Sequence, residues 1–290
     1  MKRPAQRVSL IGTLHYYSLR ALQMLNGLCD DKEKAMLQRI QETLTRIEAE
    51  HGVRIIYACE SGSRGWGFAS ADSDWDVRFI YCHPQDWYLS ITEERDVIEL
   101  PIDALLDVNG WDLRKSLRLM KKSNPVLLEW LSSPIVYRED AVAMAAYRSL
   151  ALELYQPADC LHHYLHMAKG NFREYLQGEM VWLKKYFYVL RPVLACLWIE
   201  RKLGVVPMVF DDLVAGVVQD GELKNSIVKL AELKRSGTEM DKGLRIPVLH
   251  SFLEREIERL EELVAEVSRN PVAAELQAKI NRYFRAILER

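Results

Sequence analysis

Apolar positions recur at helical spacing in one segment near the start of the chain. Between residues 31 and 50, five apolar residues follow one another at three- and four-residue steps with charged residues between them: Met36, Leu37, Ile40, Leu44 and Ile47. This spacing places the five side chains on one face of an amphipathic helix. The pair His51-Gly52 predicts its end, because glycine commonly follows the last turn of a helix.

Three stretches after this helix have the composition of β-strands. Residues 53–59 (VRIIYAC) are mostly β-branched or aromatic and precede Ser61-Gly62-Ser63, so they predict a buried strand. Residues 75–82 (WDVRFIYC) repeat this composition with some alternation. Residues 96–106 (DVIELPIDALL) predict one or two further strands, interrupted by Pro101.

The rest of the chain is predicted to be helical almost throughout. A basic helix follows Trp111, and Asn124-Pro125 begins another, because proline suits the first turn of a helix. Further helices are expected over residues 141–155, 159–177, 179–203, 223–234, 247–269 and 271–290. The last two can form either a dimer surface or an intramolecular hairpin. The pattern therefore predicts an α+β fold: an N-terminal extension (1–30), a head with a small mixed β-sheet and flanking helices (31–138), and an all-helical second domain (139–290).

Composition and charge exclude several classes of protein. A chain of 290 residues that is 49% hydrophobic and 28% charged is globular rather than disordered. Its net charge of -2 means that any contact with a polyanion must use a local basic face. The apolar segment 8–29 is interrupted by polar residues, and no other stretch approaches the roughly 20 apolar residues of a membrane span. Five scattered cysteines without a C-x-x-C pair fit reduced thiols. We expect a cytoplasmic protein with no membrane partner.

The candidate chemistry lies in residues 60–81, ESGSRGWGFASADSDWDVRFIY. Gly62-Ser63 follows a predicted strand, and Asp74-Trp75-Asp76 begins the next one after ten intervening residues. Gly62 allows a tight turn and a close approach to a ligand, and the following N–H groups and the Ser63 hydroxyl can bind phosphate oxygens. Residues two apart on a strand point to the same face, so Asp74 and Asp76 project together and repel unless a cation lies between them.

This combination of residues favours nucleotidyl transfer. Hard oxygen ligands suit Mg²⁺, which one or two carboxylates commonly hold together with substrate phosphates. Two such ions about 4 Å apart can activate an attacking hydroxyl and neutralise a leaving pyrophosphate. Other chemistries lack their motifs, because the chain contains no G-x-x-x-x-G-K-[ST] phosphate loop, no dinucleotide-binding fingerprint and no G-x-S-x-G.

At these residues the sequence resembles a known family. Gly62-Ser63, ten residues and Asp74-x-Asp76 are similar to the signature of the polymerase-β-type nucleotidyltransferase superfamily. The longer text GSRGWGFASADSDWDVRFIY, followed by GWDLRKSLRLMKKSNPVLLEWLSSPIVY at 110–137, resembles its bacterial and phage branch, some members of which are linked to RNA repair. The resemblance extends from about residue 37 to at least residue 210. It implies a nucleotidyltransferase head and a helical domain with the substrates in the cleft between them.

The resemblance also implies residue roles in the head. Gly62 and Ser63 would hold the nucleoside triphosphate, and Asp74 and Asp76 would bind two metal ions, Mg²⁺ or Mn²⁺. A third carboxylate on a neighbouring strand would help to activate the acceptor hydroxyl. Its candidates are Glu99, Asp103, Asp107 and Asp112. Asp107 is favoured because it lies shortly before the basic helix, where the family usually has this residue.

In the helical domain, the resemblance implies contacts to the nucleotide. Lys169 and Arg173 lie four residues apart on one predicted helix, and Lys184 lies four before Tyr188 on the next, so each pair can share a face toward the head. The basic candidates for the phosphates are Arg64, Lys169, Arg173, Lys184, Lys185 and Arg191. The sequence does not rank them.

The acceptor and several other features remain open. An RNA end is favoured by the resemblance and by the basic helix after Asp112. The alternatives are a protein hydroxyl, as in adenylylating antitoxin-like relatives, and a non-catalytic module that binds nucleotide or RNA. Arg78 can be a structural ion-pair partner of the acidic pair or a phosphate contact.

Three local patterns have both a structural and a functional interpretation. His162 and His166 have the spacing of zinc ligands, but nucleotide contacts or polar packing are favoured for them and for His163. The basic helix is more often a solvated face than a nucleic-acid contact. The aromatic cluster Trp182, Tyr186, Phe187 and Tyr188 is expected to fill a core rather than stack on a base.

Overall fold

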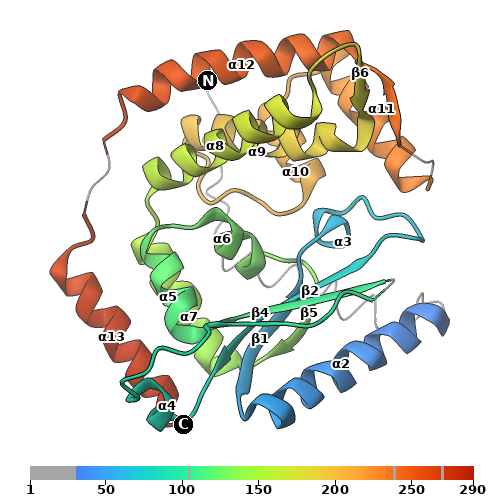
Figure 1. Ribbon diagram of the computed structural model, residues 1–290. Helices are drawn as coiled ribbons and strands as arrows, with labels where there is room; N and C mark the ends of the chain where they lie inside the picture. Colours follow the sequence, from blue (N-terminus) through green and yellow to red (C-terminus); the bar gives the residue numbers. More distant parts are fainter. Residues whose placement is uncertain (1–30, 104, 238–239, 269–270) are drawn as a thin grey trace, which may run out of the picture.

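The computed structural model describes residues 31–103, 105–237, 240–268 and 271–290. The predicted N-terminal extension 1–30, with its interrupted apolar stretch and Cys29, lies outside the described residues. The strands of the main sheet are β1 (Arg54–Glu60), β2 (Trp75–Cys82), β3 (Val97–Glu99), β4 (Leu106–Asp112) and β5 (Val136–Glu139), in the order β3-β4-β2-β1-β5 (Figure 1). β2 and β4 are parallel, whereas the other neighbours are antiparallel. The α+β class and the mixed sheet are confirmed.

Helices cover both faces of this sheet. On one face, α2 (Asp31–His51) buries Ile40, Leu44 and Ile47 against a core that includes Val77 and Phe79. On the other face lie α5 (Leu113–Lys121), α6 (Pro125–Leu131) and α7 (Ala141–Leu154). Because side chains alternate along a strand, the residues of β2 and β4 that lie between the positions facing α2 point toward this second layer. Asp76 on β2 and Asp107 on β4 occupy such positions.

The second layer continues into a helical body made of α8 (Pro157–Tyr175), α9 (Tyr186–Glu200), α10 (Phe210–Val217), α11 (Glu222–Arg235) and α12 (Pro247–Ala265) (Figure 1). α9 is buried along most of its length and forms the centre of this body. Two short helices, α3 (Ser63–Trp66) and α4 (Gln85–Tyr88), interrupt the sheet connections. The ring of Phe68, just after α3, lies 4.5 Å from that of Phe187, so α3 is packed against the helical body.

The predicted continuous helix over residues 179–203 is wrong in its first part. Met180–Trp182 forms a strand, β6, which pairs with β7 (Lys242–Leu244), and Leu183–Lys185 forms a single 3-10 turn, η1, before α9 begins. The backbone N–H of Leu183 donates to Asp241 O at 3.0 Å. Helical periodicity cannot reveal this partner, which lies about sixty residues further along the chain. Lys184 and Tyr188 therefore do not share one helix.

The last two helices do not form the intramolecular hairpin that was one alternative. α12 lies along α8, α9 and α11, whereas α13 (Ala274–Leu288) packs against α5 and α7 beside the sheet (Figure 1). The ring of Phe284 lies 4.9 Å from that of Tyr88, and Arg54 donates to Ile287 O at 2.8 Å. The chain thus returns to the head at its C-terminal end. A dimer surface on these helices stays a prediction.

The described residues contain no membrane-spanning helix and no reactive cysteine. None of their helices combines the length and apolar character needed to cross a membrane. Cys59, Cys82, Cys160 and Cys196 are unpaired and buried. Burial raises the pKa of all four thiols, so none of them has the character of a reactive thiolate.

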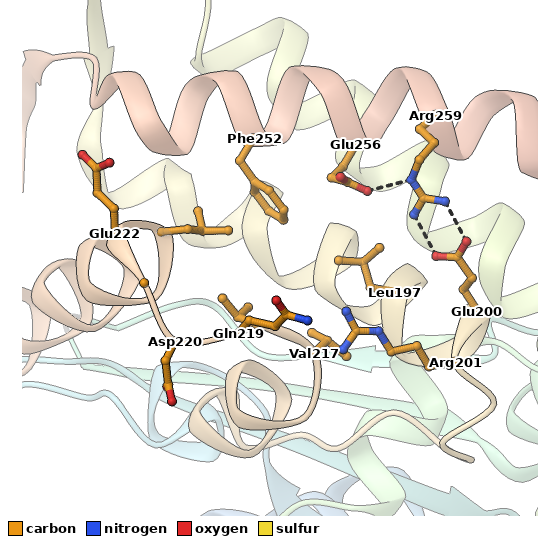
Figure 2. Close-up of a pocket in the computed structure, with 13 residues that line it drawn as sticks. Leu197, Glu200, Arg201, Val217, Gln219, Asp220, Glu222, Phe252, Glu256 and Arg259 are labelled. Atoms are coloured by element: carbon orange, nitrogen blue, oxygen red, sulfur yellow. Dashed lines mark hydrogen bonds and ion pairs between the residues drawn. The ribbon is translucent and has the colours of Figure 1, made fainter.

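An ion pair fastens α12 to the end of α9. The guanidinium of Arg259 donates two hydrogen bonds to Glu200, at 2.6 and 2.7 Å, and a third to Glu256 at 2.9 Å (Figure 2). These residues border a cavity of about 450 Å³ that Phe252 also lines. The hydrogen bonds from Arg259 lower the pKa of Glu200, with partial burial opposing.

Replacing Arg259 with glutamine is expected to lower the free energy of unfolding by about 0.5–1 kcal/mol near neutral pH, because the pair is partly exposed. Since the pKa of Glu200 is lowered in the fold, this contribution is complete above its ordinary value of about 4.3 and is lost as the pH falls through the lowered value. Urea unfolding of wild type and variant at a series of pH values measures it. Arg255→Gln, at the more exposed Arg255, is the matched control. If the difference in free energy of unfolding between wild type and Arg259→Gln stayed constant as the pH fell below the pKa of Glu200, this account would be contradicted.

Candidate active site

Three carboxylates meet at one edge of the main sheet, where β2 and β4 begin. The two strands are parallel, and their register places Asp76 directly opposite Asp107. Asp74 precedes β2 by one residue. All three line a cleft of about 310 Å³, together with Ile102, Asp103 and Leu106. The structure therefore brings together the three acidic residues that the sequence singled out.

The other candidates for the third carboxylate are engaged elsewhere. Asp112 lies at the far end of β4, is fully buried, accepts a hydrogen bond from the Tyr88 hydroxyl and caps α5 through the N–H of Arg114. Glu99 on β3 accepts a hydrogen bond from Asn109 at 2.8 Å and pairs with Arg95. Asp103, at the rim of the cleft, pairs with Arg39. Among the four candidates, Asp107 is the one opposite Asp76.

Arg78 lies between two of the acidic side chains. Its Nη2 is 2.7 Å from Asp107 Oδ2 and 3.3 Å from Asp76 Oδ1, so the ion-pair alternative describes what this residue does in the structure. Burial raises the pKa of Asp76, Arg78 opposes this rise, and the charges of Asp107 and Asp74 add to it. Arg64 also opposes the rise, so three carboxylates face two guanidinium groups. The excess of negative charge is what a cation site requires.

The arrangement also bears on which cation these residues can hold. Among the described residues, no three His, Cys, Asp or Glu side chains are placed to surround one ion. An all-protein cage for zinc or calcium is therefore not formed there. Mg²⁺ needs fewer ligands from the protein, because one or two carboxylates and substrate phosphates commonly hold it. The donor set of Asp74, Asp76 and Asp107 fits Mg²⁺ or Mn²⁺ in that shared manner.

The Gly-Ser turn is in direct contact with β2, the strand that carries Asp76 (called the acidic strand below). The N–H of Ser61 donates to Asp76 O at 2.9 Å. A Cβ atom at Gly62 would lie 1.7 Å from Asp76 Oδ2, which is impossible without movement. The φ of Gly62 is -83°, so space rather than a left-handed backbone requires glycine here. Sequence reasoning expected Gly62 to allow a tight turn and approach a ligand; in the structure it approaches Asp76.

Glu60 joins the turn to the acidic strand, and the sequence analysis missed it. Its carboxylate is fully buried and accepts hydrogen bonds from the N–H of Asp76 at 2.9 Å and of Gly62 at 3.3 Å, while the Tyr137 hydroxyl donates to its other oxygen. Burial raises the pKa of Glu60, and these hydrogen bonds oppose the rise. The available signal was a glutamate ending an otherwise apolar strand. Because the N–H of Gly62 donates to Glu60, the backbone N–H groups that follow Gly62 are the ones that can bind a ligand.

Arg64 positions the loop that carries Asp74. Its guanidinium donates to Ser73 O at 2.9 Å and to Asp74 O at 3.3 Å, and it lies 3.9 Å from the centroid of the Trp75 ring. These contacts hold the backbone immediately before β2. A contact between Arg64 and phosphate stays a prediction.

Two basic candidates of the helical domain are directed away from the cleft or fixed in the core. Lys169 on α8 pairs with Glu261 of α12, on the side of α8 that packs against α12 rather than the head. Arg191 is buried, pairs with Glu129 and donates to Met208 O at 2.8 Å, so it is structural. The expectation that Lys169 faces the head is wrong. Arg173, four residues after Lys169, is exposed.

Lys185 contacts two aromatic rings of the helical body. Its Nζ lies 4.3 Å from the ring centroid of Tyr175 and 4.5 Å from that of Tyr188. Tyr188 is near enough to the acidic residues that Asp76 and Asp74 contribute, after burial, to raising its pKa. Of the basic candidates in the helical body, Lys185 is thus linked to the cleft through one shared neighbour.

The aromatic cluster divides into two pairs. Tyr186 and Phe187 are buried, as the core interpretation expected. Trp182 and Tyr188 are 36% and 45% exposed, so for these two the core interpretation is wrong. Trp182 belongs to the strand β6 rather than to the predicted helix, whereas Tyr188 lies on α9, at one of the few positions of that helix that are not buried.

The basic helix α5 follows the end of β4, whereas the residues of the cleft lie where β2 and β4 begin (Figure 1). It starts after Asp112, five residues beyond Asp107, which corresponds to roughly 17 Å along a strand. Arg114 lies over the ring of Tyr88, and Lys115 pairs with Asp96. Proximity in sequence between Asp107 and this helix therefore does not become proximity in space.

The histidine group lies apart from the acidic cleft. His162, His163 and His166 line a cavity of about 610 Å³ with Lys122 and Asp159. None of the residues that line the acidic cleft borders this cavity. No metal-binding cluster is formed by the described His, Cys, Asp and Glu residues, so the zinc alternative gains no support.

Comparison with known proteins identifies the family of this chain. The resemblance to the polymerase-β-type nucleotidyltransferase family that was noted in the sequence is confirmed. The chain belongs to the RNA repair pathway DNA polymerase beta family (RlaP), whose model matches residues 36–286.

Two individual proteins are similar to this chain. "Uncharacterized protein YcgL" of Bacillus subtilis (strain 168) is 54% identical over 232 residues, which are 80% of this chain and 89% of that protein. The crystal structure of a nucleotidyltransferase-like protein from Exiguobacterium sibiricum has 14% identity and a TM-score of 0.27, over 87% of this chain and 80% of that one. The family assignment rests on the family model.

Proposed function

We propose that this protein is a metal-dependent nucleotidyltransferase that moves a nucleoside monophosphate from a nucleoside triphosphate to the hydroxyl of an RNA end and releases pyrophosphate. One observation carries the proposal. The Gly62 turn touches Asp76, and Asp76 lies opposite Asp107 beside an open cleft. Phosphate-binding groups and metal-binding groups are thus contiguous, as transfer at an α-phosphate requires.

The residues of the cleft have distinct tasks in this reaction. Mg²⁺ or Mn²⁺, held by Asp74, Asp76 and Asp107, would neutralise charge on the triphosphate and on the leaving group. The Ser63 hydroxyl and the N–H groups after Gly62 bind the β- and γ-phosphates. Asp107 orients the acceptor hydroxyl and accepts its proton as the new oxygen–phosphorus bond forms. The bond from the α-phosphorus to the bridging oxygen breaks, and that oxygen leaves with pyrophosphate.

The helical domain is proposed to complete the nucleotide site. The head, residues 31–138, supplies the acidic cleft, and residues 139–290 contribute to nucleotide and acceptor binding. Support comes from Lys185, which contacts the ring of Tyr188, and from the packing of Tyr188 against Trp66 of α3, the helix that follows Gly62. Lys185 and Lys184 then neutralise phosphate charge, and exposed Arg173 lies on the adjacent helix.

RNA is proposed as the acceptor because the family description names an RNA repair pathway. The test incubates the purified protein and Mg²⁺ with each labelled triphosphate in turn, together with an RNA oligonucleotide or with total protein. We expect label in RNA, with none transferred when EDTA is present. Label in protein would replace RNA with a protein hydroxyl, and bound but unreacted triphosphate would identify a nucleotide-binding module without catalysis.

A further inference from the structure

An exposed tryptophan is flanked by two lysines at the edge of the helical body. Trp182 ends β6 directly opposite Lys242 of β7. The Nζ of Lys242 lies 5.2 Å from the Trp182 ring centroid, and the Nζ of Lys184 lies 5.8 Å from it. We call Trp182, Lys184 and Lys242 the β6–β7 strip. Both ammonium groups lie over the exposed ring on flexible side chains, and a base that displaces them can stack on the ring while they contact its phosphates.

The β6–β7 strip leads directly to the acidic cleft. Lys185, adjacent to Lys184 in the chain, contacts the ring of Tyr188, and that ring lies 5.9 Å from the ring of Trp66 on α3, the helix of the Gly-Ser turn. In Figure 1, β6 lies above α3, on the same side of the molecule. A strand whose end is in the cleft can therefore continue over η1 to Trp182.

The surroundings of the strip are locally positive although the whole chain is not. Residues 179–185 and 240–245 contain four basic residues and two acidic ones, against a net charge of -2 for the chain. The basic residues are Lys184, Lys185, Lys242 and Arg245, and the acidic ones are Glu179 and Asp241. Met180 and its cross-strand partner Leu244 add exposed apolar surface beside the ring. This combination favours an occupant with both anionic and flat apolar groups.

We propose that the β6–β7 strip binds the unpaired end of the RNA acceptor, with a base stacked on Trp182 and backbone phosphates contacting Lys184 and Lys242. The inference rests on the proposed function, which places an acceptor end in the cleft. The strand must be unpaired, because the faces of bases in a duplex are covered by their neighbours. Lysines that replace counterions along the strand make its binding dependent on salt.

Fluorescence anisotropy of a labelled, unstructured RNA oligonucleotide tests the proposal without triphosphate, so that binding is separated from transfer. Replacing Trp182 with alanine is expected to weaken binding about tenfold or more, and replacing it with phenylalanine should retain most of the affinity. Lys242→Gln and Lys184→Gln should each weaken binding and lower the slope of log affinity against log salt by about 0.7. Thermal unfolding checks that each variant is folded.

Lys121→Gln is the matched control, since Lys121 is an exposed lysine on the basic helix α5, beyond the end of β4. It should bind RNA as the wild type does. Wild-type affinity in the Trp182→Ala variant would overturn the proposal, as would equal affinity for a duplex, a loss confined to Lys121→Gln, or no binding of RNA by the wild type. If the wild type transfers nucleotide to RNA but Trp182→Ala binds RNA as the wild type does, the strip is refuted and the proposed function stands. If RNA binding depends on the strip but no transfer is detected, the proposed function is refuted and the strip stands.

Discussion

Replacing Asp76 with asparagine is expected to reduce nucleotidyl transfer by about 10³-fold and to leave the metal-free protein at least as stable as the wild type. Loss of a metal carboxylate removes several kcal/mol of charge stabilisation in the transition state, and each 1.4 kcal/mol is about tenfold in rate. The pKa of Asp76 is raised in the fold, so at neutral pH its ionised form is disfavoured there relative to the unfolded chain. Asparagine removes that cost. Single-turnover transfer and thermal unfolding measure the two effects.

Asp103→Asn is the matched control for this variant. Asp103 lines the same cleft but pairs with Arg39 at its rim, so its replacement should leave most of the activity. Mg²⁺ should raise the unfolding temperature of the wild type and of Asp103→Asn but not that of Asp76→Asn, because a ligand stabilises only the state that binds it. Full metal-dependent transfer by Asp76→Asn would refute the assigned site.

The core of the site was predictable because its signal is local. Gly62-Ser63 and Asp74-x-Asp76 are separated by a fixed short spacing between two strands of clear composition. Alternation along a strand predicts that Asp74 and Asp76 project together, and both line the cleft although Asp74 lies one residue before β2. Likewise, the three- and four-residue spacing of Ile40, Leu44 and Ile47 was enough to predict α2 and its buried face.

The remaining parts depend on contacts between distant residues. Asp107 reaches Asp76 through parallel pairing of β2 and β4, and nothing in the composition of either strand specifies that register. The β6–β7 pair joins segments about sixty residues apart, and it replaces the predicted start of a helix. Glu60 was placed just after the first predicted strand and given no role, because its role depends on where the backbone of Asp76 passes. Local periodicity carries none of this information.

Replacing Gly62 with alanine is expected to abolish most of the transfer activity and to destabilise the protein by about 1–3 kcal/mol, as overpacking of a tight contact does. The new Cβ would meet Asp76 Oδ2 at 1.7 Å and Asp76 Cγ at 2.5 Å, so the carboxylate must leave its place. Unlike Asp76→Asn, this variant keeps every charged group of the site. Urea unfolding and single-turnover transfer measure the two losses.

A double-mutant cycle with Asp76→Ala shows whether that contact is the cause. Alanine at position 76 removes both of the shortest contacts and leaves the one to Cβ at 3.0 Å, so most of the destabilisation by Gly62→Ala should disappear in this background. Gly170→Ala on α8 is the control, since a Cβ there meets nothing within 4 Å and a helical alanine stabilises by about 1 kcal/mol. An equal loss of stability from Gly62→Ala in both backgrounds would show that Gly62 is required for another reason, and that the turn and the acidic strand are not coupled through this approach.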